Sequence, residues 1–301
     1  MMRSIPLRGF DQECASKIVA HMEEHGTRFL RGCVPTRFEK LPSGQVRVTW
    51  SEGKEKAVGH EDFDTVLLAI GRYALTQQLN LDKIGVEVDI HSRKVINPPD
   101  APGATVGDTE QSTCQHIFAV GDVAGPYQFT HTASHMAWYA SVNALFGLFK
   151  KFKVDYSVIP WATFCSPEVA RVGINEKEAC TQNIPYEVSV YDVSDLDRSI
   201  VDEEAHGLVK VLTVPGGDKI LGVTIAANHA GEIIGEFTLA MKHRIGLNKI
   251  LGTIHIYPTF MEMNKFAASE WRKNHKPEWA LILAEKFHRW RRGTPKEKSV
   301  V

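Results

Sequence analysis

The sequence has 301 residues, of which 43% are hydrophobic and 24% are charged, and its formal net charge is −1. These values are ordinary for globular proteins, and the length allows two domains or so, each with its own core. The balanced charge gives no indication of a nucleic-acid or membrane partner, and the lack of a long apolar run excludes a membrane-spanning helix.

The N-terminal quarter of the chain predicts a helix followed by strands. The helix is expected over residues 10–25, with an apolar stripe of Ile18, Val19 and Met22 and with Gly26 beyond its end. The strands after it are typical of the second half of a nucleotide-binding α/β unit, but the G-x-G-x-x-G fingerprint of the first half occurs nowhere. These elements are short strands at 29–30 and 46–50, a hairpin at 54–62 and a buried strand at 66–70.

The middle of the chain contains a buried strand and a helix. Residues 117–120 are four consecutive apolar residues, which predict a buried strand that ends at Gly121 and Asp122. A helix is expected over 132–149. The segments before this strand are a mixed connector at 79–96, with a short strand at 85–88, and a loop at 98–103.

From residue 159 onward, strands are followed by helices, which indicates an α+β domain. Asn175 is expected to cap a short helix over 175–183, with Glu178 at the capping-box position. An amphipathic, partly basic helical tail is expected over 271–292, and residues 294–301 are expected to be disordered. The other elements are strands at 161–164, 169–173, 208–214 and 220–226 and a helix at 232–243.

The cysteines bear on the redox compartment. No two of the five are spaced as a C-x-x-C or C-x-x-x-x-C pair, and this odd, unpatterned set suits a reducing compartment better than secretion. The chain also begins without a signal-like apolar segment. We therefore expect a cytoplasmic location, with a mitochondrion or another organelle left open. The cysteines are Cys14, Cys33, Cys114, Cys165 and Cys180.

Three motifs occur in a fixed order along the chain. Residues 64–72 have the form D-x-v-l-x-A-x-G-R, residues 116–122 the form h-I-y-A-x-G-D, and residues 255–262 the form H-x-x-P-T-x-x-E. In this order they resemble the pyridine nucleotide-disulfide oxidoreductases, which include thioredoxin, glutathione, lipoamide and mercuric reductases. The resemblance covers nearly the whole chain, from Met1 to about Arg292.

The resemblance implies a fold class and a domain order. Incomplete, Rossmann-like α/β nucleotide-binding portions would be followed by an α+β dimerisation domain. The implied parts are the C-terminal half of an NAD(P)H-binding domain at 1–74, the C-terminal segment of an FAD-binding domain at 75–156, the dimerisation domain at 157–274, and a helical tail with a disordered end at 275–301.

The resemblance is not uniform along the chain. Residues 1–95 are most similar to the NADPH domain of large thioredoxin reductases, whereas residues 121–292 are more similar to a mercuric-reductase-related branch. The seam between them falls near 97–113. A divergent lineage and a hybrid chain both remain open as explanations.

Arginines near the N-terminus are candidates for NADPH binding. A guanidinium group is planar and keeps its charge, so it can bind phosphate oxygens bidentately. Spacing alone favours two exposed surface arginines, Arg3 and Arg8, but the resemblance implies that their segment holds the 2′-phosphate of NADPH. The residues implied in NADPH binding are Arg3, Ser4 and Arg8, and also, mainly through close backbone approach and packing, Ala69, Gly71 and Arg72.

The resemblance also implies an FAD site at the second motif. Asp122 would accept a hydrogen bond from the ribityl chain of FAD, and Gly121 would let the backbone come close. The N-terminus of the next helix would aim its N–H groups at the flavin ring and favour negative charge on the reduced flavin. The helix residues implied in this site are Thr130, His131, Thr132 and Ala133.

Two histidines on this helix raise the question of a metal. His131 and His135 stand four residues apart, a spacing that could hold a metal ion. No third ligand is evident in the sequence. We therefore expect no metal site, and we expect both histidines to line or pack beside the cofactor site.

The third motif bears on mechanism. The resemblance implies the form H-x-H-P-T-x-x-E, in which the second histidine is the acid/base for a partner's thiols and the glutamate orients it. Here His255 and Glu262 match the first histidine and the glutamate, but Tyr257 stands at the base position. Because the unperturbed pKa of tyrosine is about 10, it is a poor general base near neutral pH. Tyr257 with Glu262 is a candidate proton- or hydrogen-bond-donating pair, and a structural tyrosine at the interface is the alternative.

The activity implied by the resemblance is that of an FAD-dependent NAD(P)H oxidoreductase, which passes hydride from NADPH to FAD and on to a thiol/disulfide or related acceptor. The sequence has neither the C-x-x-x-x-C disulfide nor the glycine fingerprint that holds FAD. We therefore expect an incomplete chain that lacks the first third and does not reduce a disulfide by itself. Phe10, Val66, Leu67 and Ile70 are then expected to expose a sheet edge.

Two alternatives stay open. One is a non-catalytic homodimer built on the dimerisation domain, with vestigial nucleotide sites, which cofactor retention would distinguish. The other is a metal-handling protein, suggested by the mercuric-reductase-like part, which metal analysis would distinguish. We expect a homodimer formed through residues 157–274, and no nucleic-acid or membrane partner.

Overall fold

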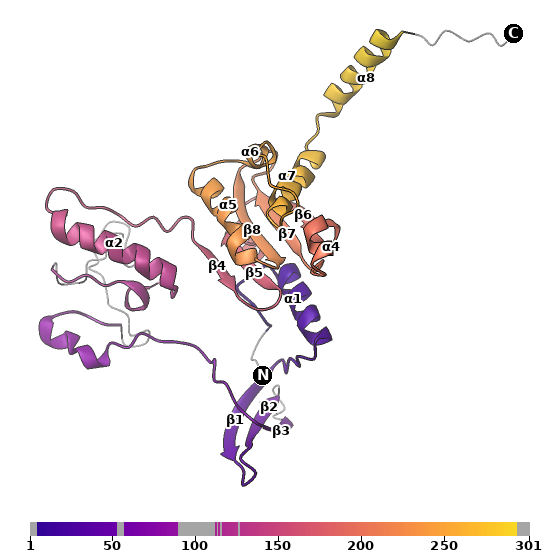
Figure 1. The fold of residues 1–301 in the computed structure, drawn as a ribbon. Coiled ribbons are helices and arrows are strands. Elements are labelled where there is room, and N and C mark those ends of the chain that lie inside the picture. Colours follow the sequence, from indigo (N-terminus) through magenta and orange to yellow (C-terminus); the bar gives the residue numbers. More distant parts are fainter. Residues whose placement is uncertain are drawn as a thin grey trace. The chain divides into compact units, whose positions relative to one another are not determined.

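The computed structural model describes residues 5–52, 57–89, 112, 114, 116–125 and 127–293 (Figure 1). They form two compact units. The first unit contains residues 30–161, and the second contains residues 5–29 together with residues 162–293. The four predicted domains stay a prediction. The two units are divided differently from them, because residues 5–29 belong to the unit that also holds the C-terminal half.

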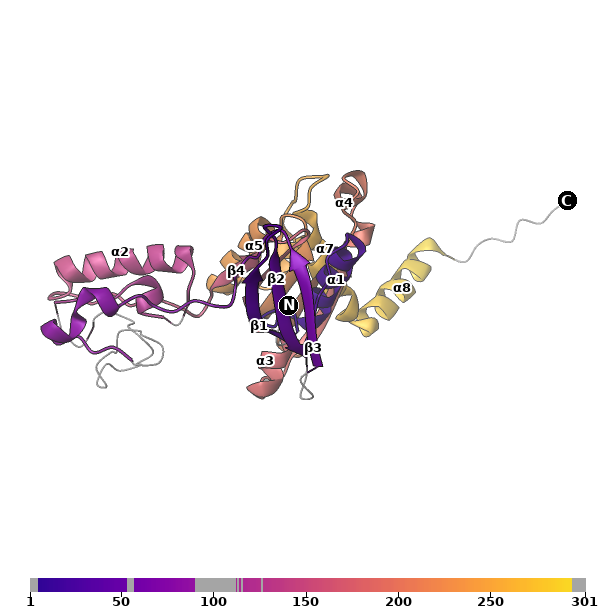
Figure 2. The same ribbon diagram turned by 90° about the horizontal axis from the view of Figure 1, so that it is seen from below.

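The first unit begins with a three-stranded antiparallel sheet, in which the strands lie side by side in chain order (Figure 2). The strand predicted at 46–50 is present. The described residues of the hairpin predicted at 54–62 form a single strand that pairs with it, and residues 29–30, also predicted as a strand, form none. A side-chain pair stabilises this sheet, since Arg47 donates two hydrogen bonds, of 2.7 and 2.8 Å, to the carboxylate of Asp62 on the facing strand. The strands are β1 (Cys33–Lys40), β2 (Val46–Glu52) and β3 (Ala57–Phe63).

The buried strand predicted at 66–70 is not formed, and this prediction was wrong. The segment is irregular, and Leu67 and Ile70 are strongly exposed. It lines an apolar hollow of about 290 Å³ together with Phe38 and Val48 of the small sheet. A continuous apolar run becomes a buried strand only where neighbouring strands pair with both of its edges, and no such neighbours occur among the described residues.

The rest of the first unit is built around one helix, α2 (Thr130–Phe146), close to the helix predicted at 132–149. The strand predicted at 117–120 is reduced to a single bridging residue, Phe118. The apolar residues of this segment still contribute to a small core around Met136 of α2. The other elements are short 3-10 helices, η1 (Gln77–Leu79), η2 (Leu81–Ile84) and η3 (Gly121–Val123).

A five-stranded sheet in the order β4-β5-β8-β7-β6 belongs to the second unit, apart from the first two residues of β4. Four of its strands were predicted, and β6 was not. The reason is that β6 buries Ser189 and Tyr191 while Val188 and Val190 are exposed, which reverses the usual alternation. The strands are β4 (Pro160–Thr163), β5 (Glu168–Gly173), β6 (Glu187–Asp192), β7 (Leu208–Thr213) and β8 (Ile220–Ala227).

Helices cover this sheet. Strand β7 is buried along its whole length, so both of its faces are covered. Among the covering elements are α5 against β5 and β8, and α7 against β6 and β7 (Figure 1). None of the helices in the described ranges is long and apolar enough to cross a membrane. The helices of this part are α3 (Glu176–Thr181), α4 (Asp197–Val201) after η4 (Val193–Asp195), α5 (Ala230–Lys242), α6 (Leu247–Leu251), α7 (Glu262–Asn274) and α8 (Glu278–Arg292).

Two predictions for these helices have different outcomes. The capping box of α3 is confirmed, since Asn175 accepts from the Glu178 backbone N–H while the Glu178 side chain accepts from the Asn175 backbone. The tail expected to be helical over 271–292 is helical but interrupted, because Trp271 lies in α7, which ends at Asn274, and α8 begins after Pro277. Proline lacks the N–H that would continue the first helix.

The N-terminal helix α1 (Gln12–Glu24) is confirmed, and it packs against β5, β7 and β8 of the second unit. Ile18 and Val19 of the predicted stripe are buried. Phe10, which was expected at an exposed edge, is buried instead. Residues 294–301, expected to be disordered, lie outside the described residues.

Candidate functional site

The turn at Gly121 and Asp122 packs against the first turn of α2. Gly121 has a φ of +73°, a conformation that favours glycine. A Cβ atom at this position would lie 3.1 Å from the Cβ of Ala133, so a larger side chain would push the turn away from the helix. Gly121 therefore lets this turn approach α2 closely.

Hydrogen-bonding groups at this turn are available. The Asp122 side chain is half-buried, and it has no hydrogen bond or ion pair with any residue that the structure describes. The residue before α2, Phe129, provides no side-chain cap for the helix N-terminus. A free carboxylate acceptor and an uncapped helix N-terminus thus lie on the same short segment, which can bind hydroxyl groups and negative charge.

Aromatic side chains fix the start of α2. The ring of His131 stacks on Phe129, and Phe129 stacks on Trp161, with ring centroids 5.2 and 5.8 Å apart. His131 Nε2 also lies 2.9 Å from the carbonyl oxygen of Pro160. The Thr132 hydroxyl donates to the Phe129 carbonyl over 2.8 Å, while Thr130 is exposed. These contacts hold the first turn of α2 in place.

The two histidines of α2 have separate partners. His131 is engaged as above, whereas the ring of His135 lies edge-on to Tyr139, with centroids 5.0 Å apart. Within the ranges that the structure describes, no group of three or more His, Cys, Asp or Glu side chains is arranged to hold a metal ion.

The residues predicted for NADPH binding are divided between the two units. Arg72 Nη2 donates to the carbonyl oxygen of Gln128 over 3.2 Å, so the 69–72 segment contacts the residues that precede α2. Ala69 is exposed, and Gly71 has a φ of +127°. Arg8 is exposed and belongs to the second unit. Arg3 and Ser4 lie outside the described residues.

His255 of the third motif is tightly held. Its side chain is only 3% exposed, its Nε2 lies 3.0 Å from Glu236 Oε1, and its Nδ1 lies 3.0 Å from the Thr253 carbonyl oxygen. Glu236 also accepts a 2.9 Å hydrogen bond from Asn264 Nδ2. Both ring nitrogens therefore face oxygen atoms of the protein. These contacts fix the orientation of the His255 ring.

Tyr257 and Glu262 share no hydrogen bond in the part of the chain that the structure describes. The Tyr257 hydroxyl donates to Asp197 Oδ2 over 3.0 Å, and this hydrogen bond together with the carboxylate charge raises the pKa of Tyr257 above its ordinary value. Glu262 is buried at the start of α7 and accepts from the Thr259 backbone N–H over 3.2 Å. Tyr257 therefore keeps its proton at neutral pH and can donate a hydrogen bond.

Sequence reasoning missed three residues of this region. Asp197 lies 60 positions from Tyr257, and Glu236 and Asn264 lie on two different helices, α5 and α7. None of the three belongs to a motif, so no signal in the sequence pointed to them. Only the packing of α4, α5 and α7 brings them to the third motif.

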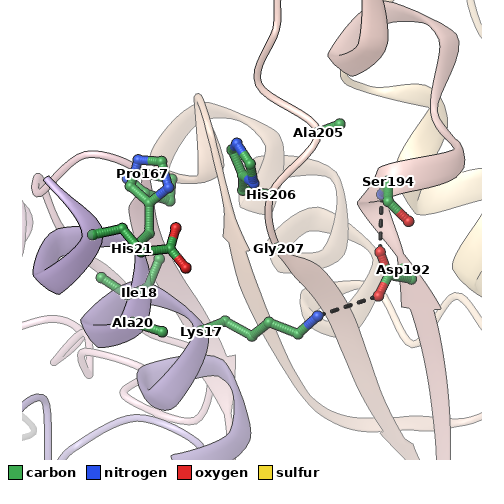
Figure 3. A pocket seen from close by; sticks show the side chains of 11 residues that line it. Lys17, Ile18, Ala20, His21, Pro167, Asp192, Ser194, Ala205, His206 and Gly207 are labelled. Carbon is green, nitrogen blue, oxygen red and sulfur yellow. Dashed lines mark hydrogen bonds and ion pairs between the residues drawn. The ribbon is translucent and has the colours of Figure 1, made fainter.

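A polar cavity of about 250 Å³ lies where α1 meets the second unit's sheet, and its lining residues are shown in Figure 3. Lys17 Nζ lies 3.4 Å from Asp192 Oδ2, and Asp192 accepts from the Ser194 backbone N–H over 2.9 Å. The ring of His21 lies against the rings of His25 and His206, at centroid distances of 4.3 and 4.8 Å. This cavity contains none of the residues predicted for cofactor binding or catalysis.

Two family models match the chain. The model for the pyridine nucleotide-disulphide oxidoreductase family matches residues 1–137, and the model for the dimerisation domain of the same family matches residues 159–268. The second match lies within the dimerisation domain predicted at 157–274.

Several curated proteins are similar over most of this chain. Thioredoxin reductase SEP1 of Emiliania huxleyi is 30% identical over 290 residues, which are 92% of this chain and 56% of that protein. A dihydrolipoyl dehydrogenase of Chlamydia muridarum is 33% identical over 239 residues, 79% of this chain and 47% of the other. A mercuric reductase of Lysinibacillus sphaericus is 30% identical over 270 residues, 89% and 46% of the two chains. The chain thus spans about half the length of the curated relatives it matches.

Solved structures share the fold. The HOCl-induced flavoprotein disulfide reductase RclA of Escherichia coli is similar with a TM-score of 0.76 and 21% identity, covering 88% of this chain and 56% of that one. LpdA of Mycobacterium tuberculosis has a TM-score of 0.74 and 20% identity, covering 87% and 53%. The predicted fold class is therefore confirmed: incomplete, Rossmann-like α/β nucleotide-binding portions are followed by an α+β dimerisation domain.

Proposed function

Because this chain belongs to the pyridine nucleotide-disulphide oxidoreductases, we propose that it functions as an FAD-dependent NAD(P)H oxidoreductase. The reaction would carry hydride from NADPH to FAD and on to a thiol/disulfide or related acceptor. The observation that carries this proposal is the free Asp122 carboxylate on a glycine turn packed against the uncapped N-terminus of α2. The five cysteines are free thiols, which fits a protein of the reducing cytoplasm.

The residues of this turn fit the polar parts of FAD. The Asp122 carboxylate would accept hydrogen bonds from the ribityl hydroxyls, and Gly121 leaves room for the cofactor chain. The N–H groups at the start of α2, from Thr130 to Ala133, would favour negative charge on the flavin ring. FAD, when bound there, supplies the two-electron redox chemistry.

Basic and small residues are assigned to NADPH. Arg8, with Arg3 and Ser4, would hold the 2′-phosphate, because guanidinium groups bind phosphate oxygens bidentately. Ala69, Gly71 and Arg72 would form the backbone surface on which the nucleotide lies. The hydrogen bond from Arg72 to the Gln128 carbonyl supports a link between this segment and the FAD side.

The third motif would contribute a hydrogen-bond donor. The Tyr257 hydroxyl is kept protonated by Asp197, and its one O–H would turn from Asp197 to donate to the acceptor substrate or to a leaving thiolate. His255 and Glu262 would hold the loop that carries Tyr257. The ring of His255 contacts Thr253 and Glu236, and the Glu262 side chain accepts a hydrogen bond from Thr259. A general-base role at this position is disfavoured by the raised pKa of Tyr257.

A second candidate function is a non-catalytic homodimer built on the dimerisation domain. One observation favours it: Ile254 is 96% and Ile256 is 78% exposed beside the third motif, within the residues that the dimerisation-domain model matches, where a partner would cover them. In this case the nucleotide segments would be vestigial.

A visible absorption spectrum distinguishes the two functions. The purified chain would be incubated with FAD, freed of unbound FAD by gel filtration, and measured before and after anaerobic addition of NADPH. We expect a retained flavin band that bleaches with NADPH. Asp122→Ala should lose the band, whereas Asp195→Ala, which removes an exposed carboxylate from the second unit, should keep it. A colourless wild-type chain would contradict the oxidoreductase proposal and favour the non-catalytic dimer.

A further inference from the structure

Helix α8 presents an apolar face that nothing in the described structure covers. It extends over 15 residues, Glu278–Arg292, and none of them is buried. Its large apolar side chains are mostly exposed, including Trp279 at 72% and Trp290 at 77%. An isolated helix of this length is only marginally stable in water, so a surface that covers its apolar face would also stabilise the helix.

Most of the large apolar residues of α8 form one continuous stripe, and Leu281 lies on the opposite side of the helix. At 100° per residue, Trp279, Leu283 and Phe287 follow one another at intervals of four residues, and Ile282 and Trp290 lie beside them. The rings of Phe287 and Trp290 are 6.0 Å apart. A tryptophan therefore stands near each end of the stripe.

Positive charge gathers at the C-terminal half of the same helix. Residues 286–292 contain four basic and no acidic side chains, and Arg289 pairs over 2.6 Å with Glu285 one turn earlier. Three of the basic residues, Arg289, Arg291 and Arg292, lie away from the centre of the apolar stripe. The net charge of the whole chain hides this cluster, because acidic residues elsewhere cancel it.

This combination fits a negatively charged lipid surface. A helix of 15 residues is about 22 Å long, which is less than the roughly 30 Å hydrocarbon core of a bilayer, so α8 is too short to span it. Aromatic residues on one face with arginine on the other are typical of helices that lie in the membrane interface. We propose that α8 lies flat on an anionic phospholipid surface, with Trp279, Leu283, Phe287 and Trp290 inserted and the arginines against the headgroups.

The charge cluster makes the proposal specific. Each basic residue near an anionic surface strengthens binding by about fivefold, and the effect is screened by salt. Binding by α8 should therefore require anionic lipid and weaken as the salt concentration rises. A partner helix or a second copy of this chain would need neither condition.

Vesicle flotation with the full chain tests the proposal. The probes are vesicles of phosphatidylcholine alone and vesicles of phosphatidylcholine mixed with phosphatidylserine. We expect binding to the mixed vesicles only. The triple variant Arg289→Glu, Arg291→Glu, Arg292→Glu should bind them about a hundredfold less or weaker still, and Trp279→Ser with Phe287→Ser and Trp290→Ser should also lose binding. Because no residue of α8 is buried, neither variant should change the melting temperature.

A matched control carries the same change of net charge elsewhere in the second unit. Lys177→Glu, Lys219→Glu and Lys249→Glu replace three exposed lysines, and this variant should float as the wild type does. No flotation of the wild type, or equal loss in the control variant, would overturn the proposal. The proposal would also be overturned if the wild-type chain did not bind vesicles and the tryptophan variant sedimented differently from it, since α8 would then bind a second copy of the chain. Flavin binding does not enter any of these outcomes.

Discussion

At the scale of single residues, Lys210 organises the contact between α1 and the sheet. Its side chain is 5% exposed, and its Nζ lies 3.0 Å from Asp11 Oδ1, 2.5 Å from Glu13 Oε2 and 2.7 Å from Glu176 Oε1. Asp11 is also the N-cap of α1 and accepts from the Glu13 and Cys14 backbone N–H groups. One buried ammonium group therefore joins α1, β7 and α3.

Replacing this lysine should destabilise the second unit. Lys210→Met leaves the buried Asp11 carboxylate without its cation, and we expect a loss of about 2 to 3 kcal/mol in the free energy of unfolding. The value is below that of a fully buried pair because Glu13 and Glu176 are partly exposed. Lys17→Met, which removes a half-exposed pair with Asp192, should cost about 0.5 kcal/mol or less. Urea unfolding checks both values, and equal losses would contradict this account of Lys210.

The pKa of Lys210 makes the stabilisation by Lys210 and its three carboxylate partners depend on pH. Burial alone would lower this pKa, but hydrogen bonds to Glu13, Glu176 and Asp11 outweigh it and raise the pKa above its ordinary value. The stabilisation is therefore complete below the unfolded pKa of about 10.4 and is lost as the pH rises beyond it.

His21 should make the protein less stable in mild acid. Burial lowers the pKa of His21, the nearby His25 and His206 lower it further, and Glu204 and Glu24 oppose the change. Lys17 and Asp192 also line this cavity. Because the unfolded histidine has a pKa of about 6.5, the unfolded chain binds more protons in the interval below that value. Stability is then lost as the pH falls from about 6.5 toward the folded pKa.

Urea unfolding at a series of pH values measures this effect. His21→Gln should flatten the acid limb of the stability profile, since it removes the group that must take up the proton. His288→Gln, on the exposed helix α8, should leave the profile unchanged. A wild-type stability that stays constant as the pH falls from 7 to below about 6 would contradict the assignment to His21.

At the scale of elements, local signals predicted the structure where the interactions themselves are local. The capping box of α3 joins residues three positions apart, so Asn175 and Glu178 could be identified from the sequence. Strand β6 was missed because its burial depends on α7, which packs on it from the far end of the chain. The apolar run at 66–70 failed for the same reason, since its burial requires partner strands.

Gly222 in β8 sets how closely this strand approaches Ile174, the residue after β5. A Cβ atom on Gly222 would lie 1.9 Å from the Ile174 carbonyl oxygen, so a side chain cannot fit without moving backbone. Gly222→Ala should therefore destabilise the second unit by at least about 1 to 3 kcal/mol. Gly217→Ala, whose nearest atom would be the Val214 oxygen at 3.8 Å, should change stability by less than about 0.5 kcal/mol. Thermal unfolding of the two variants measures the difference, and a tolerated Gly222→Ala would show that β8 can shift.

At the scale of the whole molecule, the dimerisation domain predicts association. Ile254 and Ile256 are strongly exposed on the segment between α6 and α7. Ile254→Glu with Ile256→Glu should convert a homodimer into a monomer, because two carboxylates would have to be desolvated at the interface. Sedimentation velocity measures the outcome. Leu145→Glu with Leu148→Glu, at exposed apolar positions in the first unit, should remain dimeric. A monomeric wild type would contradict the homodimer.

The sequence by itself determined the family and the fold class, because three motifs occur in a fixed order along the chain. It also determined helix α1, the capping box and the Gly121-Asp122 turn, because each of these depends on residues close together in the chain. It also indicated that Tyr257 is unsuited to general-base catalysis. Only the tertiary structure decided that Tyr257 bonds to Asp197 rather than to Glu262, and that Glu236 holds His255. These partners come from separate helices, so their hydrogen bonds and the resulting pKa change exist only after the helices pack, and no local spacing records them.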